Sequence, residues 1–147
     1  MKIYVLNGPN LNMLGTREPT VYGNETYASL IKRIKAYAKS RKIRVKCLQS
    51  NHEGTLVDMI HGAYFHGASG IVFNPGAYTH TSIALLDALK ATRIPTVELH
   101  ISDVDAREDF RKTSYIRPAC IATVSGHGTD GYLEAIDILM THKEEQK

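Results

Sequence analysis

The sequence predicts an α/β domain in which a five-stranded parallel sheet is covered by helices on both faces. Short apolar runs of strand length alternate with longer segments of helical periodicity along the whole chain. Most of the strand-like runs are apolar almost throughout, as in parallel strands buried on both faces. The chain has 147 residues, with neither an internal repeat nor a linker. We therefore expect one domain spanning residues 1–147.

Five strand–helix units account for the chain. We expect strands at residues 2–6, 43–48, 71–73, 96–100 and 119–124. We expect helices that begin after a cap at Asn24, at about 53–65, at 81–91, within 102–112 and around 133–140. Helical spacing predicts the inward-facing residues Tyr27, Leu30, Ile34, Tyr37, Leu56, Ile60, Tyr64, Ile83, Leu86, Leu89, Leu133, Ile136 and Leu139.

Composition narrows the class of protein. Apolar residues make up 43% of the chain and the net charge is +3 without a long basic run, so nucleic-acid binding has no support. The apolar run at residues 3–6 is too short for a signal peptide, and no run reaches transmembrane length. Cys47 and Cys120 fall in predicted strands, where we expect buried reduced thiols of a cytoplasmic protein. Two cysteines do not suffice for a four-cysteine zinc site.

The order of the strands predicts where a ligand binds. For five such units the natural arrangement is the flavodoxin-like order 2-1-3-4-5, whose switch point lies between strands 1 and 3. Ligands of open α/β sheets bind at such a point, beside the carboxyl ends of the strands. Polar residues gather at this edge: Asn10 after strand 1, then Asn74, His80 and Ser82 with strand 3, then Glu98, His100 and Ser102 with strand 4, and Arg107 and Arg111 after them.

The long connection at residues 13–24 is typical of a lid or binding loop and contains Arg17 and Tyr22. A tyrosine base, with a reference pKa of about 10, needs an adjacent cation to work near neutral pH. Arg17 lies close enough in sequence to supply it. Glu98 can orient or charge His100, because alternate residues of a strand share a face.

Arg107 and Arg111 are four residues apart and share a face if their segment is one short helix. Arginines and helix N-termini suit a substrate carboxylate. Together these groups predict acid–base chemistry on a small polar acid, without a metal or nucleotide.

Three other functions compete with this prediction. A hydrolase would use Ser82, Asp87 and either His80 or His100, but the Gly-x-Ser-x-Gly pattern is absent around Ser82. A metal-assisted lyase would use His80, Glu98 and His100, and would lose activity on chelation. A non-catalytic binding module would bind a ligand without turnover. Nucleotide-binding glycine patterns are absent.

The chain resembles the type II 3-dehydroquinate dehydratases over nearly its whole length. Five motifs carry the resemblance: NGPNLNMLGTREPTVYG (7–23), NPGAYTHTSIALLDAL (74–89), VELHIS (97–102), AREDFR (106–111) and GYLEA (131–135). The family has the flavodoxin-like fold and converts 3-dehydroquinate to 3-dehydroshikimate, in the shikimate pathway or in quinate breakdown. The resemblance implies neither a metal nor a Schiff-base lysine.

The resemblance also implies roles for individual residues. Tyr22 would remove the C2 proton to give an enolate, and Arg17 would lower the pKa of Tyr22 and close with the lid. His100, with Glu98 as its partner, would protonate the departing C1 hydroxyl. Asn10 would stabilise the enolate, through a water molecule.

Substrate contacts follow in the same way. The resemblance assigns them to Asn74, Gly76, His80, Ile101, Ser102, Arg107 and Arg111, with backbone N–H groups donating at Ile101 and Ser102. The family assembles as a dodecamer, a tetramer of trimers, in which Asp87 would reach the site of a neighbouring subunit.

Three residues depart from the family pattern. Asp103 and Asp105 replace a common Asn and His, and His127 replaces a common Leu. The two added carboxylates flank Arg107 and Arg111. We expect weaker substrate affinity and no change of reaction.

This expectation is tested by Asp105→His. The substitution removes a negative charge near the two arginines, so KM for 3-dehydroquinate should fall. Steady-state kinetics measure it, and an unchanged KM would contradict the expectation.

Overall fold

A computed structural model describes residues 1–16 and 25–147. The strands are β1 (Lys2–Asn7), β2 (Arg44–Gln49), β3 (Gly70–Asn74), β4 (Thr96–His100) and β5 (Ala122–Ser125). The α-helices are α2 (Tyr27–Ser40), α3 (Glu53–Phe65), α4 (Ile83–Thr92) and α5 (Asp130–Glu145). Short 3-10 helices are η1 (Leu11–Met13), η2 (Gly76–His80), η3 (Val104–Ala106), η4 (Asp109–Lys112) and η5 (Arg117–Ala119).

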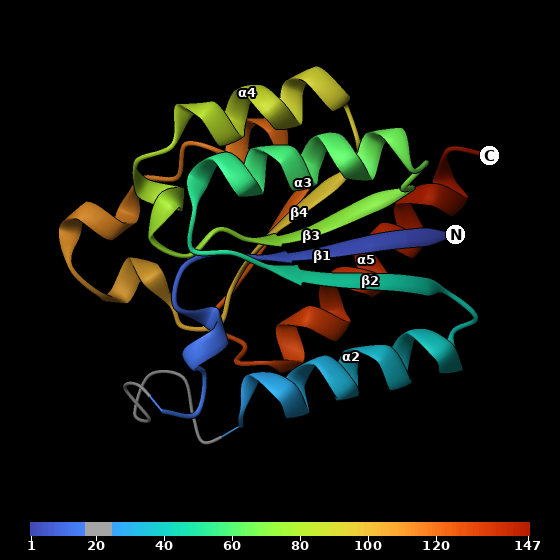
Figure 1. The fold of residues 1–147 in the computed structure, drawn as a ribbon, viewed down its shortest axis with the longest axis horizontal. Helices are drawn as coiled ribbons and strands as arrows, with labels where there is room; N and C mark the ends of the chain where they lie inside the picture. The colour runs from blue at the N-terminus through green and yellow to red at the C-terminus, as the bar shows by residue number, and fades with distance from the viewer. Residues whose placement is uncertain (17–24) are drawn as a thin grey trace.

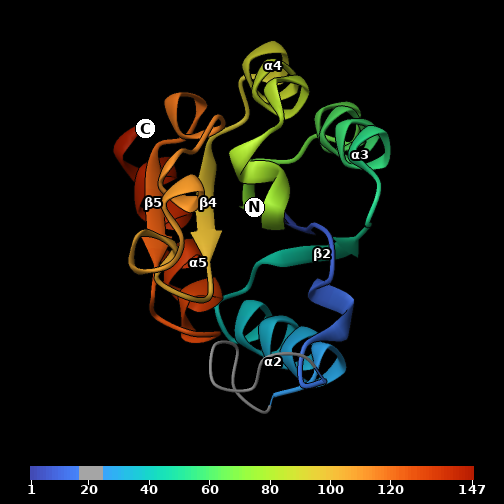
Figure 2. The same ribbon diagram turned by 90° about the vertical axis from the view of Figure 1, so that its left-hand side faces the viewer.

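The strands form one parallel sheet in the order β2-β1-β3-β4-β5, which confirms the predicted topology. Helices α3 and α4 cover one face and α2 and α5 cover the other (Figures 1 and 2). The strands run from right to left in Figure 1, so their carboxyl ends lie on the left, beside η1 to η4. Asn7 pairs with Asn74 across β1 and β3, and Phe73 pairs with Glu98 across β3 and β4.

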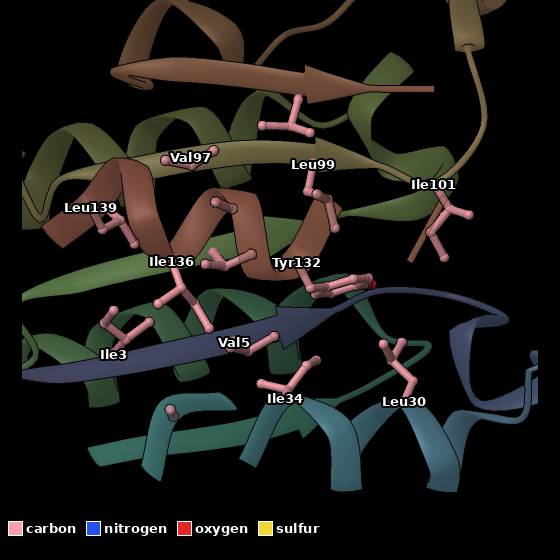
Figure 3. Packing of buried hydrophobic residues seen from close by; sticks show 14 of the residues in the cluster. Ile3, Val5, Leu30, Ile34, Val97, Leu99, Ile101, Tyr132, Ile136 and Leu139 are labelled. Atoms are coloured by element: carbon pink, nitrogen blue, oxygen red, sulfur yellow. The ribbon is translucent and has the colours of Figure 1, made fainter. Parts of the chain in front are cut away.

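Two apolar layers hold the sheet. Leu56, Ile60, Leu85 and Leu89 pack on the face beneath α3 and α4. Figure 3 shows the opposite layer, in which Tyr132 of α5 lies between β1 and β4 with its hydroxyl toward the carboxyl ends of the strands. Tyr132 is fully buried, so its phenol has to find polar partners inside the protein.

Several predicted boundaries were wrong. The cap of α2 is Thr26, whose hydroxyl accepts from the Ser29 backbone N–H, whereas Asn24 lies outside the described residues. Strand β5 begins at Ala122 because residues 117–119 form η5, in which Pro118 fixes the first turn.

Cys120 consequently lies outside the strand, while Cys47 lies in β2. Both thiols are free and half-buried. Burial raises the pKa of Cys47 to about 11 and that of Cys120 to about 12.

Some predicted helix faces were also wrong. The Ser82 cap sets the phase of α4 so that Leu85, Ala88 and Leu89 face inward and Ile83 is 56% exposed. Tyr64, near the end of α3, is exposed as well. In α5 the buried stripe is Tyr132, Ile136 and Leu139, and Leu133 is only half-buried.

A substitution in the turn after β1 tests how tightly the loops at the carboxyl edge pack. A Cβ added at Gly8 would lie 2.2 Å from the Pro75 carbonyl oxygen, so backbone would have to move. We expect Gly8→Ala to lower the free energy of unfolding by about 2 kcal/mol or more. Gly62→Ala is the matched control, because a Cβ at Gly62 in α3 meets nothing within 4 Å. It should raise stability by about 0.5–1 kcal/mol. Urea unfolding measures both, and equal effects of the two variants would contradict this packing.

Candidate active site

A cleft opens at the carboxyl edge of the sheet, between the segments that follow β1, β3 and β4. It is lined by Pro9, Asn10, Leu11, Leu14, Asn74, Gly76, Ala77, His80, His100, Ile101, Ser102, Val104, Arg107 and Arg111. Nine of the residues predicted from the sequence are among them: Asn10, Asn74, Gly76, His80, His100, Ile101, Ser102, Arg107 and Arg111. The edge selected by topology is therefore the edge where these side chains meet.

Two described residues that the sequence predicted are not among those that line the cleft. Glu98 lies behind His100, and Asp87 is exposed on α4 away from the cleft. Arg17 and Tyr22 lie outside the described residues.

The turn after β1 is tied to both neighbouring strand ends. The Gly8 N–H donates to the Asn74 carbonyl at 2.8 Å. Asn10 adopts a left-handed backbone with φ of 70°, a conformation that Asn tolerates better than most residues. Its backbone N–H donates to the Asn51 side-chain oxygen at 3.0 Å. These contacts fix where Asn10 enters the cleft.

Asn74 is held by a buried hydrogen-bond chain. Its side-chain oxygen accepts from the Gly76 N–H at 3.1 Å, and its side-chain nitrogen donates to the Tyr132 hydroxyl at 3.1 Å. The Tyr132 hydroxyl in turn donates to the side-chain oxygen of Asn7 at 2.6 Å. Burial raises the pKa of Tyr132, so the phenol stays protonated and remains a donor. The chain of contacts fixes which side-chain atom of Asn74 donates and which accepts.

The sequence prediction missed Tyr132 as part of this chain. The available signal was its helical spacing with Ile136 and Leu139, which places a phenol on the buried stripe of α5.

His80 is oriented by a backbone carbonyl. Its Nδ1 lies 2.7 Å from the Thr113 oxygen, and a carbonyl can only accept. Nδ1 therefore carries the proton in the neutral ring, and Nε2 is the nitrogen left as an acceptor for a ligand. A further backbone bond, from Tyr115 N–H to Thr79 oxygen at 2.9 Å, joins η2 to the segment after η4.

Glu98 and His100 form the only buried acid–base pair recorded among the described residues. Glu98 is fully buried and His100 is 4% exposed. His100 Nε2 lies 2.5 Å from Glu98 Oε2. Glu98 also accepts from Ser114 Oγ at 3.0 Å and from Arg117, through Nε at 3.2 Å and Nη2 at 2.9 Å.

These contacts keep Glu98 ionised. Burial alone would raise the pKa of Glu98, but the bonds from His100 and Arg117 lower it to about 2. An ionised carboxylate only accepts, so His100 carries a proton on Nε2. Nδ1 is then the ring nitrogen left for a substrate, and it carries a proton only when the ring is charged. This geometry suits a general acid at the cleft.

Two arginines place positive charge at the same cleft. The prediction that they share one short helix was wrong, because Arg107 follows η3 as its cap and Arg111 belongs to η4. Glu108 accepts from Arg111 Nε at 2.6 Å and lies 4.0 Å from Arg107 Nε. One exposed carboxylate therefore partly balances two cations that line the cleft.

Comparisons with known proteins agree with this geometry. The model of the family "Dehydroquinase class II" matches residues 1–140. A "3-dehydroquinate dehydratase" of Clostridium perfringens (strain 13 / Type A) is 51% identical over 142 residues, covering 97% of each chain. One of Rhodopseudomonas palustris (strain BisA53) is 57% identical over 134 residues, covering 91% of this chain and 89% of the relative.

The crystal structure of a type II dehydroquinase from Butyrivibrio crossotus DSM 2876 superposes with a TM-score of 0.94. Its sequence is 54% identical, covering 95% of this chain and 97% of that one. The chain belongs to the dehydroquinase class II family.

In this dehydroquinase family member, the geometry argues against two of the competing functions. Ser82 is 1% exposed and its hydroxyl caps α4 by accepting from Leu85 N–H, so it is not placed as a hydrolase nucleophile. The three residues of the metal-assisted lyase do not form one set of metal ligands. Hydrogen-bond donors already surround the Glu98 carboxylate, and the His80 ring is bonded to the Thr113 carbonyl. Among the described residues, no three His, Cys, Asp or Glu side chains are grouped to hold a metal ion.

The residues that depart from the family pattern make contacts of their own. Asp103 caps η3 by accepting from the Asp105 N–H, and His127 contacts Glu134 at 2.7 Å on the surface. In the described part of the chain, no helix is long and apolar enough to cross a membrane.

The buried carboxylate predicts a pH dependence of stability. The pKa of Glu98 is about 2 in the folded protein, against 4.5 for the same side chain in the unfolded chain, so the ionised form favours folding. This stabilisation is present above pH 4.5 and is lost as pH falls toward 2; it amounts to about 3 kcal/mol.

Glu98→Gln tests this dependence. The variant should be less stable at neutral pH, and its unfolding free energy should fall less steeply between pH 4.5 and 2. Glu145→Gln, an exposed substitution near the end of α5, should keep the wild-type slope. Urea unfolding at several pH values measures the slopes, and an unchanged slope in Glu98→Gln would rule out this linkage.

Proposed function

We propose that this protein removes water from 3-dehydroquinate to give 3-dehydroshikimate through an enolate, with Tyr22 as base and His100 as acid. Membership of the class II dehydroquinase family supports a hydro-lyase of this kind. The observation that carries the acid role is the buried Glu98–His100 pair at the cleft. The reaction serves the shikimate pathway or quinate breakdown, and we propose that it takes place in the cytoplasm.

The acid half of the reaction follows from the protonation of His100. In the charged ring, Nδ1–H donates its proton to the C1 hydroxyl. The enolate electron pair then forms the C1–C2 double bond and restores the C3 carbonyl, while the C1–O bond breaks and water leaves. The ring is then neutral and keeps its Nε2 proton, because ionised Glu98 accepts there. Glu98 thereby stabilises the charged form that must be present before each turnover.

The base half rests on two residues outside the described part of the chain. Tyr22 takes the proton from C2 as phenolate, and the electron pair moves onto the C3 carbonyl oxygen to form the enolate. Arg17 lowers the pKa of Tyr22 through its positive charge. Asn10, in its fixed position at the cleft, stabilises the enolate through a water molecule.

The remaining residues of the cleft hold the substrate. Arg111, supported by Arg107, offers its charge to the substrate carboxylate together with the backbone of Ile101 and Ser102. The oriented groups of Asn74 and His80 bind its hydroxyls.

We also propose a dodecamer, a tetramer of trimers, in which Asp87 reaches a neighbouring site. Ile83 and Asp87 support this assembly, because both are exposed and lie four residues apart on α4.

The assay follows the ultraviolet absorbance of the conjugated enone product after purified protein meets 3-dehydroquinate. Wild type should turn over with chelator present and after borohydride pretreatment. Tyr22→Phe should lose at least about 100-fold in kcat, because phenylalanine has no group that can take a proton. Tyr64→Phe, on the exposed end of α3, is the matched control and should keep wild-type activity.

Loss of wild-type turnover on chelation would favour the metal-assisted lyase. Absence of turnover by folded wild type would favour the binding module. Full activity of Tyr22→Phe would exclude Tyr22 as the base.

A further inference from the structure

Arg117 is the one cation in direct contact with buried Glu98 besides His100, among the described residues. Its side chain starts from η5, beside fully buried Ile116, and is 41% exposed. Nε and Nη2 donate to the two oxygens of Glu98 at 3.2 and 2.9 Å. Such a two-pronged contact fixes the plane of the carboxylate as well as its charge. Ser114 adds a neutral donor to the same oxygen that Arg117 Nε contacts.

We propose that Arg117 is a positioning residue for the proton transfer by His100, acting through Glu98 without touching the substrate. This inference rests on the dehydration proposed above. It adds a residue that lines no part of the cleft and belongs to none of the five motifs that carry the family resemblance.

The reason lies in the hydrogen-bond chemistry of the pair. A buried carboxylate without a cation favours its protonated form, which donates instead of accepting. A protonated Glu98 would donate to His100 Nε2, and the neutral ring would then carry its proton on Nδ1. Glu98 would no longer stabilise the charged ring. Arg117 therefore keeps Glu98 an acceptor and His100 in the form that can act as an acid.

Other charged groups around this pair do not replace Arg117. Asp105, in η3, is negative and reinforces the charge of Arg117. Cys120 follows η5, and burial raises the pKa of its thiol to about 12, so it is neutral near neutral pH. His100 is the only other charged donor to Glu98 among the described residues, and it is the group whose proton moves.

The test compares kcat and KM of Arg117→Met and Arg117→Lys with wild type in the absorbance assay. Arg117→Met keeps the length of the side chain and removes its charge, so kcat should fall about 10- to 100-fold while KM changes less than about threefold. Arg117→Lys keeps the charge and should recover part of the lost kcat. Arg41→Met is the matched control: Arg41 is also 41% exposed and pairs with Asp137, between α2 and α5, away from the cleft.

The decisive arm is a double-mutant cycle with Glu98→Gln. If Arg117 acts through Glu98, adding Arg117→Met to Glu98→Gln should lower kcat by less than about threefold more. If Arg117→Met lowers kcat by the same factor in wild type and in Glu98→Gln, the proposal is overturned, because Arg117 then acts independently of Glu98. An unchanged kcat in Arg117→Met, or a rise in KM alone, would overturn it as well.

Two measurements keep the outcomes distinct. Thermal melting and sedimentation identify a variant that has lost its fold or assembly, and Arg117→Lys then decides: a folded Arg117→Lys variant whose kcat falls as far as expected for Arg117→Met, although the positive charge is kept, would overturn the role argued for that charge. Wild-type turnover is measured in the same assay. Its absence contradicts the proposed function, whereas active wild type with fully active Arg117→Met contradicts only the role of Arg117.

Discussion

The parallel register of the three central strands is the constraint on which the site depends. Because β1, β3 and β4 run in one direction, their carboxyl ends meet at one edge, and Asn7 pairs with Asn74 while Phe73 pairs with Glu98. The strands are almost fully buried along their length, so polar residues are tolerated only where a partner lies within reach. The register brings those partners together from distant parts of the sequence.

Two buried polar groups show how this requirement is met. The Tyr132 hydroxyl enters from α5 and links the amide groups of Asn7 and Asn74, which lie on adjacent strands. Glu98 recruits Ser114 and Arg117 from the connection between β4 and β5. In both cases a group on a strand is fixed by residues far along the chain, so the site is oriented by the fold as a whole.

The sequence predicted the sheet order and the edge that carries the cleft, because strand spacing and buried apolar runs are local signals. It did not predict which face of α4 is buried. Leu86 and Leu89 fit one inward-facing stripe, Leu85 and Leu89 fit another, and the cap at Ser82 selects the second. The sequence prediction also missed Tyr132 and Arg117. Their partners lie 58 and 19 residues away, respectively, and no local periodicity records which buried acceptor a side chain reaches.

The arginines around the cleft are suited to different tasks by their surroundings. Arg111 pairs with Glu108, which is 54% exposed, and solvent screens such an exposed ion pair so that it contributes little to stability. In the proposed reaction, the substrate carboxylate therefore replaces Glu108 at little cost. Arg117 pairs with a carboxylate that is wholly buried, and removing this cation would leave His100 as the only charged donor to that carboxylate among the described residues. An arginine side chain thus provides an exchangeable contact at position 111 and a permanent one at position 117. The difference follows from the burial of the carboxylate that each of them meets.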